Sequence, residues 1–322
     1  MDDRWTVLLP AEIDPAGPDS LTDIATLESA AQYGTVEDLR AAIHRYDAII
    51  DRLLDLSAPT LERAENLQVI ARHGVGLDNI DIEAASEQDI LVCNTPGANA
   101  RSVAEHAVML LMAARRRAVR ADRMVRSGDW DREPLLAPEL GGRTLGLFGY
   151  GAIGSIVAEL ARGIGMSVVV YDPYVEGAPD WIEFVDSKGA LFERSTAVSV
   201  HAPLTDETRG AIGHAELVAL GAEGVLVNTA RGGIVDHAAL ADALEAGTIH
   251  GAGIDVYPEE PPESDPVLEA PNVVRSPHVG AMSTDAFREM STRAADNVRA
   301  VYEGRVPEDA VNADAVSIDG NG

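Results

Sequence analysis

Short apolar runs that alternate with helical patterns constrain the fold of this chain more than any other feature of its sequence. From about residue 141, runs of strand length occur at residues 144–151, 167–172, 198–203, 224–230, 251–257 and 272–277. Helical segments lie between several of them, for example at residues 237–247. Strands that are apolar on both faces and are joined through helices form parallel sheets covered on both sides. The pattern therefore predicts a doubly wound α/β domain.

The first 95 residues repeat this alternation more weakly. Strand candidates occur at residues 6–10, 46–50, 67–74 and 89–96. The longest helical stretch, residues 99–128, follows them and is expected to link two units. A chain of 322 residues, 46% of them hydrophobic, is long and apolar enough for two domains with separate cores. We therefore expect a second, smaller α/β unit at the N-terminal end.

A glycine-rich turn connects the first strand and the first helix of the larger unit. It is a GxGxxG run made of Gly149, Tyr150, Gly151, Ala152, Ile153 and Gly154. Gly149 allows the tight turn, Gly151 lets the backbone approach a pyrophosphate, and Gly154 lets the helix pack close to the strand. The helix N-terminus then offers free N–H groups and the positive end of its dipole to phosphates. The alternative is a glycine turn in an α/β fold that binds no nucleotide.

Asp172 ends the next strand candidate, 18 residues after Gly154. A carboxylate at this place bonds the adenosine ribose hydroxyls and repels a 2′-phosphate, which favours NAD over NADP. The alternative is an acid that only starts the turn before Pro173.

We therefore predict the fold class α/β, with two Rossmann-like doubly wound parallel-sheet domains, a cleft between them, and NAD as the cofactor.

Three loops in the second half of the chain each place one polar residue soon after an apolar run. The loops NTARGG, DVYPEEPP and SPHVG contain Arg231, Glu260 and His278. Ligands of open α/β sheets bind at the carboxyl ends of the strands, where neighbouring parallel strands meet at one edge. We therefore expect the three side chains to converge, although they span 47 residues.

A cation, a carboxylate and an imidazole together suit the oxidation of a 2-hydroxy acid. The imidazole takes the hydroxyl proton as hydride leaves for a nicotinamide, and the carboxylate orients the imidazole and raises its pKa. The guanidinium clamps the substrate carboxylate through two hydrogen bonds. Each residue also has a simpler interpretation: Arg231 as a helix cap or surface ion pair, Glu260 as a solvated acid, and His278 as a structural histidine.

Beyond these arguments, the motifs are similar to those of a known family. GYGAIG with Asp172, HAPLTDET, NTARGGIVD, GAGIDVYPEEPP and SPHVGA resemble the D-isomer-specific 2-hydroxyacid dehydrogenases. RHGVGLDNID and NTPGANARSVAEH extend the resemblance into the first unit, so that it covers most of the chain from about residue 66 to 304. The resemblance implies that Arg231, Glu260 and His278 are the catalytic residues, and no metal site is expected.

The resemblance also implies further contacts. Val75 and Gly76 fall in the loop whose backbone N–H groups hold the substrate carboxylate, and Asn99 faces that pocket. His201 is implied to be a wall of the cofactor site rather than a second base. The other cofactor contacts implied are Pro203, Thr208, Thr229, Ala230 and Asp255, the last bonding the nicotinamide carboxamide.

The same resemblance implies a division into domains and a partner. The substrate-binding domain is expected to be discontinuous, with residues 1–98 and 284–322, and the NAD-binding Rossmann domain to comprise residues 99–283. The expected assembly is a homodimer formed by the NAD-binding domains.

Within the family, the chain is most similar to 3-phosphoglycerate dehydrogenases, in which an Arg-Ser-Xaa-Thr stretch meets the substrate phosphate. Here Arg52 stands in that stretch between Asp51 and two leucines, and His73 stands where a small residue is usual. Arg52 is therefore a candidate substrate contact. Reductases of hydroxypyruvate, glyoxylate or sulfolactate are the alternatives, and a non-enzymatic NAD-sensing corepressor is the alternative of another class.

The charge and the composition limit the partners and the compartment. A formal net charge of −28 repels nucleic acid and anionic lipid, so neither is expected as a partner. No apolar run reaches the ~18 residues of a membrane span, and the N-terminus lacks the pattern of a signal peptide. The single cysteine, Cys93, fits a reducing compartment, which predicts a cytoplasmic protein.

The basic residues are almost all arginine, with Lys188 as the one lysine. A GC-rich genome explains this preference through codon usage. It does not explain the excess of acid, which instead favours a high-salt cytoplasm where screening makes a dense negative surface tolerable. We therefore expect a halophilic protein.

Overall fold

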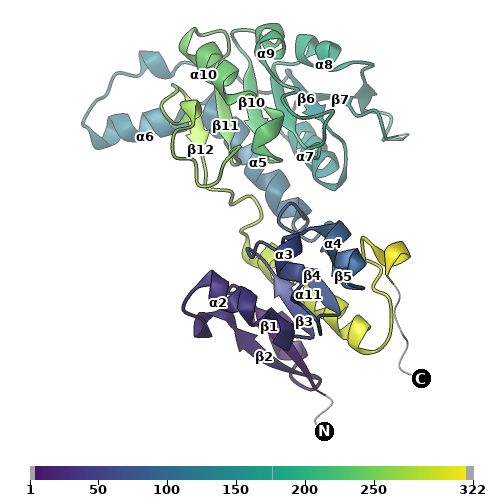
Figure 1. The fold of residues 1–322 in the computed structure, drawn as a ribbon. Coiled ribbons are helices and arrows are strands. Elements are labelled where there is room, and N and C mark those ends of the chain that lie inside the picture. Colours follow the sequence, from purple (N-terminus) through teal and green to yellow (C-terminus); the bar gives the residue numbers. More distant parts are fainter. Residues whose placement is uncertain (1–3, 176, 317–322) are drawn as a thin grey trace. The chain divides into compact units, whose positions relative to one another are not determined.

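The computed structural model describes residues 4–175 and 177–316, and it divides the chain into two compact units. Unit 1 comprises Met1–Asn99 and Met282–Gly322, and unit 2 comprises Ala100–Ala281. Each unit contains one parallel sheet with helices on both faces (Figure 1). The predicted fold class of two Rossmann-like α/β domains is thereby confirmed.

Unit 1 is built on a five-stranded sheet in the order β2-β1-β3-β4-β5. All four strand pairs are parallel. The strands are β1 Trp5–Leu9, β2 Ala25–Ser29, β3 Ala48–Asp51, β4 Val69–Arg72 and β5 Leu91–Cys93. The helices are α1 Ala16–Ser20, α2 Val36–Ala41, α3 Ala58–Leu61, α4 Ile82–Glu87 and α11 Thr284–Tyr302, with short 3-10 turns η1 Ala30–Gln32, η2 Ile43–Arg45 and η6 Ala313–Ala315.

The alternating side chains of strand β3 show how the sheet of unit 1 is buried on both faces. Ile49 packs into a cluster with residues of α3 and α4, whereas Ile50 packs against Ala294 and Val298 of α11. Successive side chains of a strand point to opposite faces, so an all-apolar strand needs cover on both. The C-terminal helix α11 supplies one of these covers.

Unit 2 is built on a seven-stranded parallel sheet in the order β12-β11-β10-β9-β6-β7-β8. The strands are β6 Thr144–Phe148, β7 Ser167–Tyr171, β8 Glu183–Phe184, β9 Ala197–Val200, β10 Val225–Asn228, β11 Gly251–Ile254 and β12 Val273–Arg275. The helices are α5 Ala100–Arg115, α6 Ala118–Arg126, α7 Ala152–Gly163, α8 Lys188–Arg194, α9 His214–Leu220 and α10 His237–Glu245. The 3-10 turns are η3 Glu133–Leu135, η4 Gly232–Ile234 and η5 Pro266–Leu268.

The strand order of unit 2 reverses between β6 and β9. From β6 the chain adds β7 and β8 on one side and then returns to place β9 on the other side. Helices α5 and α7 contribute to the cluster on one face of this sheet, and α8, α9 and α10 contribute to the cluster on the other. Open α/β sheets bind ligands outside the carboxyl ends of the strands at such a reversal.

The long helical stretch expected at residues 99–128 is two helices. Arg117 adopts a left-handed conformation, with φ 51° and ψ 40°, and separates α5 from α6. Its guanidinium donates to the carbonyl of Pro134, so a tertiary contact accompanies the break. Among residues 4–175 and 177–316, no helix is both long and apolar enough to cross a membrane.

Candidate active site

The turn between β6 and α7 has the backbone that its glycines predict. Gly149 has φ +101°, and a Cβ there would lie 2.7 Å from the backbone nitrogen of Ala202. A Cβ at Gly154 would lie 2.5 Å from the carbonyl oxygen of Gly149, so the helix rests directly on the turn. A Cβ at Gly151 would meet nothing within 4 Å. The backbone at Gly151 is therefore open to a ligand on its outer side.

The first turn of α7 keeps its N–H groups available. Gly151 is the N-cap residue and has no side chain with which to cap the helix. The first N–H groups of an α-helix have no partner within the helix, and they carry its partial positive charge. The turn therefore fits a pyrophosphate, as the sequence predicts for residues 149–154.

Asp172 lies just after β7, next to this turn. One carboxylate oxygen accepts a hydrogen bond from the N–H of Tyr150 at 2.8 Å, and the other accepts from the N–H of Tyr174 at 2.9 Å. The second bond is the turn-starting role considered above, and the first fixes the carboxylate against the glycine turn. Each oxygen keeps a lone pair for a ligand hydroxyl, which fits a ribose.

Further predicted cofactor contacts lie after β9 and β10. His201 has a buried Nε2 without a hydrogen-bond partner in the described residues, and burial lowers the pKa of its ring to about 3. A ring that stays neutral at physiological pH fits a wall of the site better than a base. Thr208 closes its loop by donating from its hydroxyl to the carbonyl of Pro203 at 2.6 Å.

A buried hydroxyl at the end of β10 also fits a bound ligand. The Oγ1 atom of Thr229 is buried and has no hydrogen-bond partner among the described residues. Its neighbour Ala230 donates its N–H to Asn228, which ends β10. Unpaired buried polar groups are uncommon in native structures, so the orphaned hydroxyl, like the open turn at Gly151, fits the dinucleotide.

Among the candidate catalytic residues, a direct contact joins His278 to Glu260. Nδ1 of His278 lies 2.7 Å from a carboxylate oxygen of Glu260, and the other carboxylate oxygen accepts from the N–H of Tyr257 at 3.0 Å. The two side chains are 49% and 38% exposed. Because Nδ1 is engaged by Glu260, Nε2 is the nitrogen of His278 that a substrate can meet.

The electrostatics of the pair suit proton transfer. The hydrogen bond to Glu260 raises the pKa of His278 against the opposing effect of burial. Burial tends to raise the pKa of Glu260, but the hydrogen bonds from His278 and from the backbone of Tyr257 outweigh it and lower the pKa. The arrangement therefore favours an imidazolium beside a carboxylate, with the ring orientation fixed.

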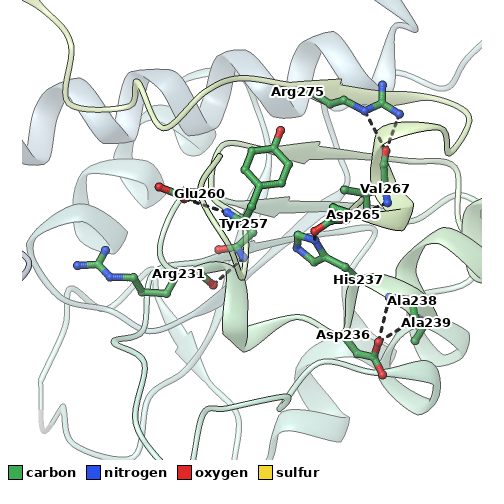
Figure 2. A network of polar contacts seen from close by, with 11 residues as sticks. Arg231, Asp236, His237, Ala238, Ala239, Tyr257, Glu260, Asp265, Val267 and Arg275 are labelled. Carbon is green, nitrogen blue, oxygen red and sulfur yellow. Dashed lines mark hydrogen bonds and ion pairs between the residues drawn. The ribbon is translucent and has the colours of Figure 1, made fainter. Parts of the chain in front are cut away.

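Arg231 follows β10, in a loop that packs directly on the loop of Glu260. A Cβ at Gly232 would lie 2.0 Å from the carbonyl carbon of Tyr257, so only glycine allows this contact. The side chains of Arg231 and Glu260 point to the same side in Figure 2. The charge of Arg231 also lowers the pKa of His278. The loops after β10, β11 and β12 thus bring the three predicted residues to one edge of the sheet of unit 2.

Asp255, another of the predicted cofactor contacts, follows β11 and is buried. Its side chain is 1% exposed, and its carboxylate accepts from the hydroxyl of Ser276 at 2.6 Å and from the N–H groups of Val279 and Gly280 at 3.0 and 2.8 Å. Burial raises its pKa, but the donors, among them His106 at 3.3 Å, outweigh it and lower the pKa to about 2. The carboxylate therefore holds the Ser276 side chain before His278 and the backbone of Val279 and Gly280 after it.

Sequence reasoning missed His106 and Ser276 as parts of this arrangement. Nε2 of His106 lies 2.9 Å from the hydroxyl of Ser276, which in turn bonds Asp255. Both residues stand inside quoted motifs, SVAEH and SPHVG, but 170 residues separate them. No local pattern shows that an α5 histidine meets a β12 loop serine.

The predicted substrate contacts Arg52, Val75, Gly76 and Asn99 belong to unit 1, whereas Arg231 belongs to unit 2. Arg52 follows β3, and its guanidinium lies 5.1 Å from the ring centre of Phe287 and 3.4 Å from the sulfur of Met282. Aromatic stacking leaves the edges of a guanidinium available to an anion.

The loop with Val75 and Gly76 follows β4. The carbonyl of Val75 accepts from Asn94, and that of Gly76 accepts from Arg72. These bonds use carbonyl oxygens only, so they hold the loop without consuming its N–H groups. Asn99, itself a predicted substrate contact, has a buried Oδ1 with no hydrogen-bond partner among the described residues, as His201 and Thr229 also have unpaired buried atoms.

Comparison with known proteins identifies the family. Residues 108–280 match the model of the D-isomer specific 2-hydroxyacid dehydrogenase, NAD binding domain. A hydroxypyruvate reductase of Thermotoga maritima is 36% identical over 299 residues, which are 92% of this chain and 97% of that protein. The chain belongs to the D-isomer specific 2-hydroxyacid dehydrogenase family. The match also confirms the NAD-binding domain that the glycine turn predicts.

Two further comparisons bear on the length and the fold. A D-3-phosphoglycerate dehydrogenase of Methanocaldococcus jannaschii is 38% identical over 93% of this chain, but the match covers 58% of that protein. The chain thus spans little more than half the length of this curated relative. A solved structure from Thermus thermophilus is 34% identical, covers 95% of this chain and 99% of that one, and has a TM-score of 0.87.

Proposed function

We propose that this protein is an NAD-dependent D-2-hydroxyacid dehydrogenase. The observation that carries the proposal is the 2.7 Å contact of His278 with Glu260, at the sheet edge that also carries the glycine turn and Arg231. When bound, NAD supplies or accepts a hydride at its nicotinamide ring. The relatives named as dehydrogenase and reductase support this assignment.

His278 moves the proton in this scheme. In the reducing direction its Nε2–H donates to the keto oxygen, and in the oxidising direction neutral Nε2 accepts the hydroxyl proton. Glu260 holds Nδ1–H and stabilises the imidazolium. A pKa above the usual value for histidine keeps the donor form present at neutral pH, and reduction is expected to fall as pH rises through that pKa.

Arg231 binds the substrate carboxylate through its guanidinium and helps to polarise the reacting oxygen. We propose unit 1 as the substrate-binding domain, with the backbone N–H groups of Val75 and Gly76 and the side chain of Asn99 as its substrate contacts. The structure supports these roles through the orphaned oxygen of Asn99 and the carbonyl-only anchoring of the loop.

The substrate class depends on Arg52. We propose 3-phosphoglycerate or a related 2-hydroxy acid as the substrate, with hydroxypyruvate, glyoxylate or sulfolactate as the competing possibilities. The stacking of Arg52 on Phe287 presents a cation in unit 1 that suits a phosphate. The His278–Glu260 pair and Arg231 have no catalytic use in a purely NAD-sensing corepressor, so that alternative is not proposed.

A substrate panel tests this function. With NADH, wild-type protein is expected to reduce phosphohydroxypyruvate or hydroxypyruvate. If phosphate is recognised, Arg52→Ala raises KM for the phosphorylated acid at least about 10-fold, because one charge-assisted hydrogen bond to the phosphate is lost. The plain 2-keto acid serves as the control and keeps its KM. Equal losses for both acids would contradict phosphate recognition, and no reduction of any 2-keto acid would contradict the function.

We also propose a homodimer formed by the NAD-binding domain. Large apolar side chains on and after α5 and α6 are exposed, namely Met109, Met112, Val125, Trp130 and Leu136. Trp130 is 73% and Leu136 86% exposed in the single chain, and exposed apolar groups that cluster along neighbouring segments are typical of interfaces. Sedimentation velocity is expected to show twice the chain mass, and a monomer at micromolar concentration would contradict the proposal.

The negative charge leads to a proposal about salt. We propose that this is a halophilic cytoplasmic protein, because a net charge of −28 destabilises a compact chain by self-repulsion unless salt screens it. Raising KCl from ~0.1 M to ~1 M, which shortens the screening length from about 10 to 3 Å, is expected to raise Tm by several degrees. Sodium and potassium chloride should act alike. An unchanged Tm and full activity without salt would contradict the proposal.

A further inference from the structure

A second acid–histidine pair lies in unit 2, outside the proposed proton-transfer residues. Nδ1 of His237, at the start of α10, lies 2.6 Å from a carboxylate oxygen of Asp265. The two side chains are only 4% and 9% exposed. Burying such a pair costs desolvation, and in some proteins the gain is a fixed local conformation rather than stability. The proposed reaction makes no direct use of this pair.

The pair anchors the segment that carries Glu260. Residues 255–272 form an 18-residue connection between β11 and β12, and long connections of this kind need contacts that hold them in place. The second oxygen of Asp265 accepts from the N–H of Val267 at 3.0 Å, and the carbonyl of Val267 accepts twice from Arg275 of β12. His237 thus links α10 to the far half of this connection.

The ring of His237 also supports Tyr257 in the near half. The two ring centres are 6.1 Å apart, with planes at 83°, an edge-to-face contact. The N–H of Tyr257 holds Glu260 at 3.0 Å. Figure 2 shows Tyr257 between Glu260 on one side and the His237–Asp265 pair on the other.

Tyr257 is mostly buried, but one side of it also lines a pocket. A pocket of about 410 Å³ adjoins Glu260 and His278, with a mostly apolar lining that includes Tyr257, Pro261, Pro262, Leu268 and Pro277. A side chain that meets a pocket has fewer atoms packed against it on that side. The contact with His237, which does not line the pocket, therefore limits how far Tyr257 and its backbone can shift.

We propose that His237 is a positioning residue: paired with Asp265, it fixes Tyr257 and thereby holds Glu260 against His278. Its consequence for catalysis rests on the proposed function, but its effect on the geometry does not. The charged and titratable groups that face His278 are Glu260, Asp255 and Arg231. His237 itself meets Asp265 and Tyr257, so it acts on His278 only through the Glu260 segment.

The test measures the imidazole pKa of His278 by NMR titration of the full-length protein without substrate or cofactor. His237→Ala removes both the ring and the donor, and is expected to lower this pKa by about 0.5–1 unit, part of the ~1–3 units that an opposite charge in contact supplies. His237→Asn keeps a donor for Asp265 but lacks the ring, and is a second variant if the first fails to fold. It is expected to shift the pKa in the same direction.

The matched control is Asp236→Ala, which removes the N-cap of the same helix, where Asp236 accepts from Ala238 and Ala239. It destabilises α10 but leaves the pKa of His278 unchanged. A wild-type pKa in a folded His237 variant, or an equal shift in Asp236→Ala, would overturn the proposal.

Kinetics give a second readout. If the protein reduces a 2-keto acid, the alkaline limb of kcat/KM moves to lower pH in the His237 variants by the same amount as the NMR pKa, and stays in place in Asp236→Ala. An unmoved limb would overturn the proposal. Absence of any reduction by the wild type would contradict the proposed function alone, because the NMR titration needs no turnover.

Discussion

Alanine in place of His278 lowers kcat for the reduction of a 2-keto acid by at least about 10²-fold, the scale of a single acid–base group. The reason lies in the contact with Glu260, which occupies Nδ1 and leaves Nε2 as the proton donor. Alanine has no donor for the developing alkoxide, so the proton must come from water. The measurement is the steady-state rate of NADH oxidation at saturating substrate.

The matched control for this substitution is His214→Ala, which removes an exposed histidine at the start of α9. Its kcat is expected to equal that of the wild type. Binding of NADH, followed by its fluorescence, is expected to survive in both variants because the glycine turn and Asp172 are intact. A wild-type kcat in His278→Ala would refute the assignment of the proton donor.

The parts of the site that sequence predicts well are those encoded by contiguous residues. The turn at Gly149 requires a positive φ and a close approach to Ala202, and both requirements are written in one GxGxxG run. Arg231, Glu260 and His278 each follow a short apolar strand, and the parallel order of β10, β11 and β12 brings their ends together. Local patterns therefore suffice for the edge of the sheet and the residues on it.

The elements that sequence missed depend on distant contacts. The edge strands β2, Ala25–Ser29, and β8, Glu183–Phe184, are partly polar and lack an apolar run. They become recognisable as strands only through their pairing with β1 and β7. α5 ends at Arg115, and neither glycine nor proline marks the break at Arg117 that follows. In the same way, the buried carboxylate of Asp255 is paired with His106, which comes from the distant helix α5.

The His237–Asp265 pair illustrates the same limit at the level of chemistry. The two residues are 28 positions apart, on a helix and in a loop with many acids. In the sequence, Asp265 cannot be told from Glu259, Glu263 or other acids of that loop. Only the packing of α10 against η5 brings Asp265, and not another acid, to His237. The support of the Glu260 segment therefore cannot be predicted from the sequence.

Substitution of Arg231 has the second large effect that we expect. Arg231→Gln removes the cation that binds the substrate carboxylate, and the loss of one partner from a buried, hydrogen-bonded charge pair costs about 2–5 kcal/mol. The expected fall in kcat/KM is therefore at least about 30-fold, since 1.36 kcal/mol corresponds to a factor of ten. Arg231→Lys keeps the charge but loses the two-bond fork, so its fall is expected to be smaller than that of Arg231→Gln.

The control is Arg194→Gln, which removes a surface arginine of unit 2 that pairs with Glu183 at 2.6 Å. A pair of this exposure contributes little to stability, and its kcat/KM is expected to match the wild type. The separate changes in kcat and KM show which step Arg231 serves. Because Arg231 is expected to contact both the carboxylate and the reacting oxygen, KM should rise and kcat should fall. A variant with a higher KM and an unchanged kcat would restrict Arg231 to binding, and wild-type values of both would remove it from the site.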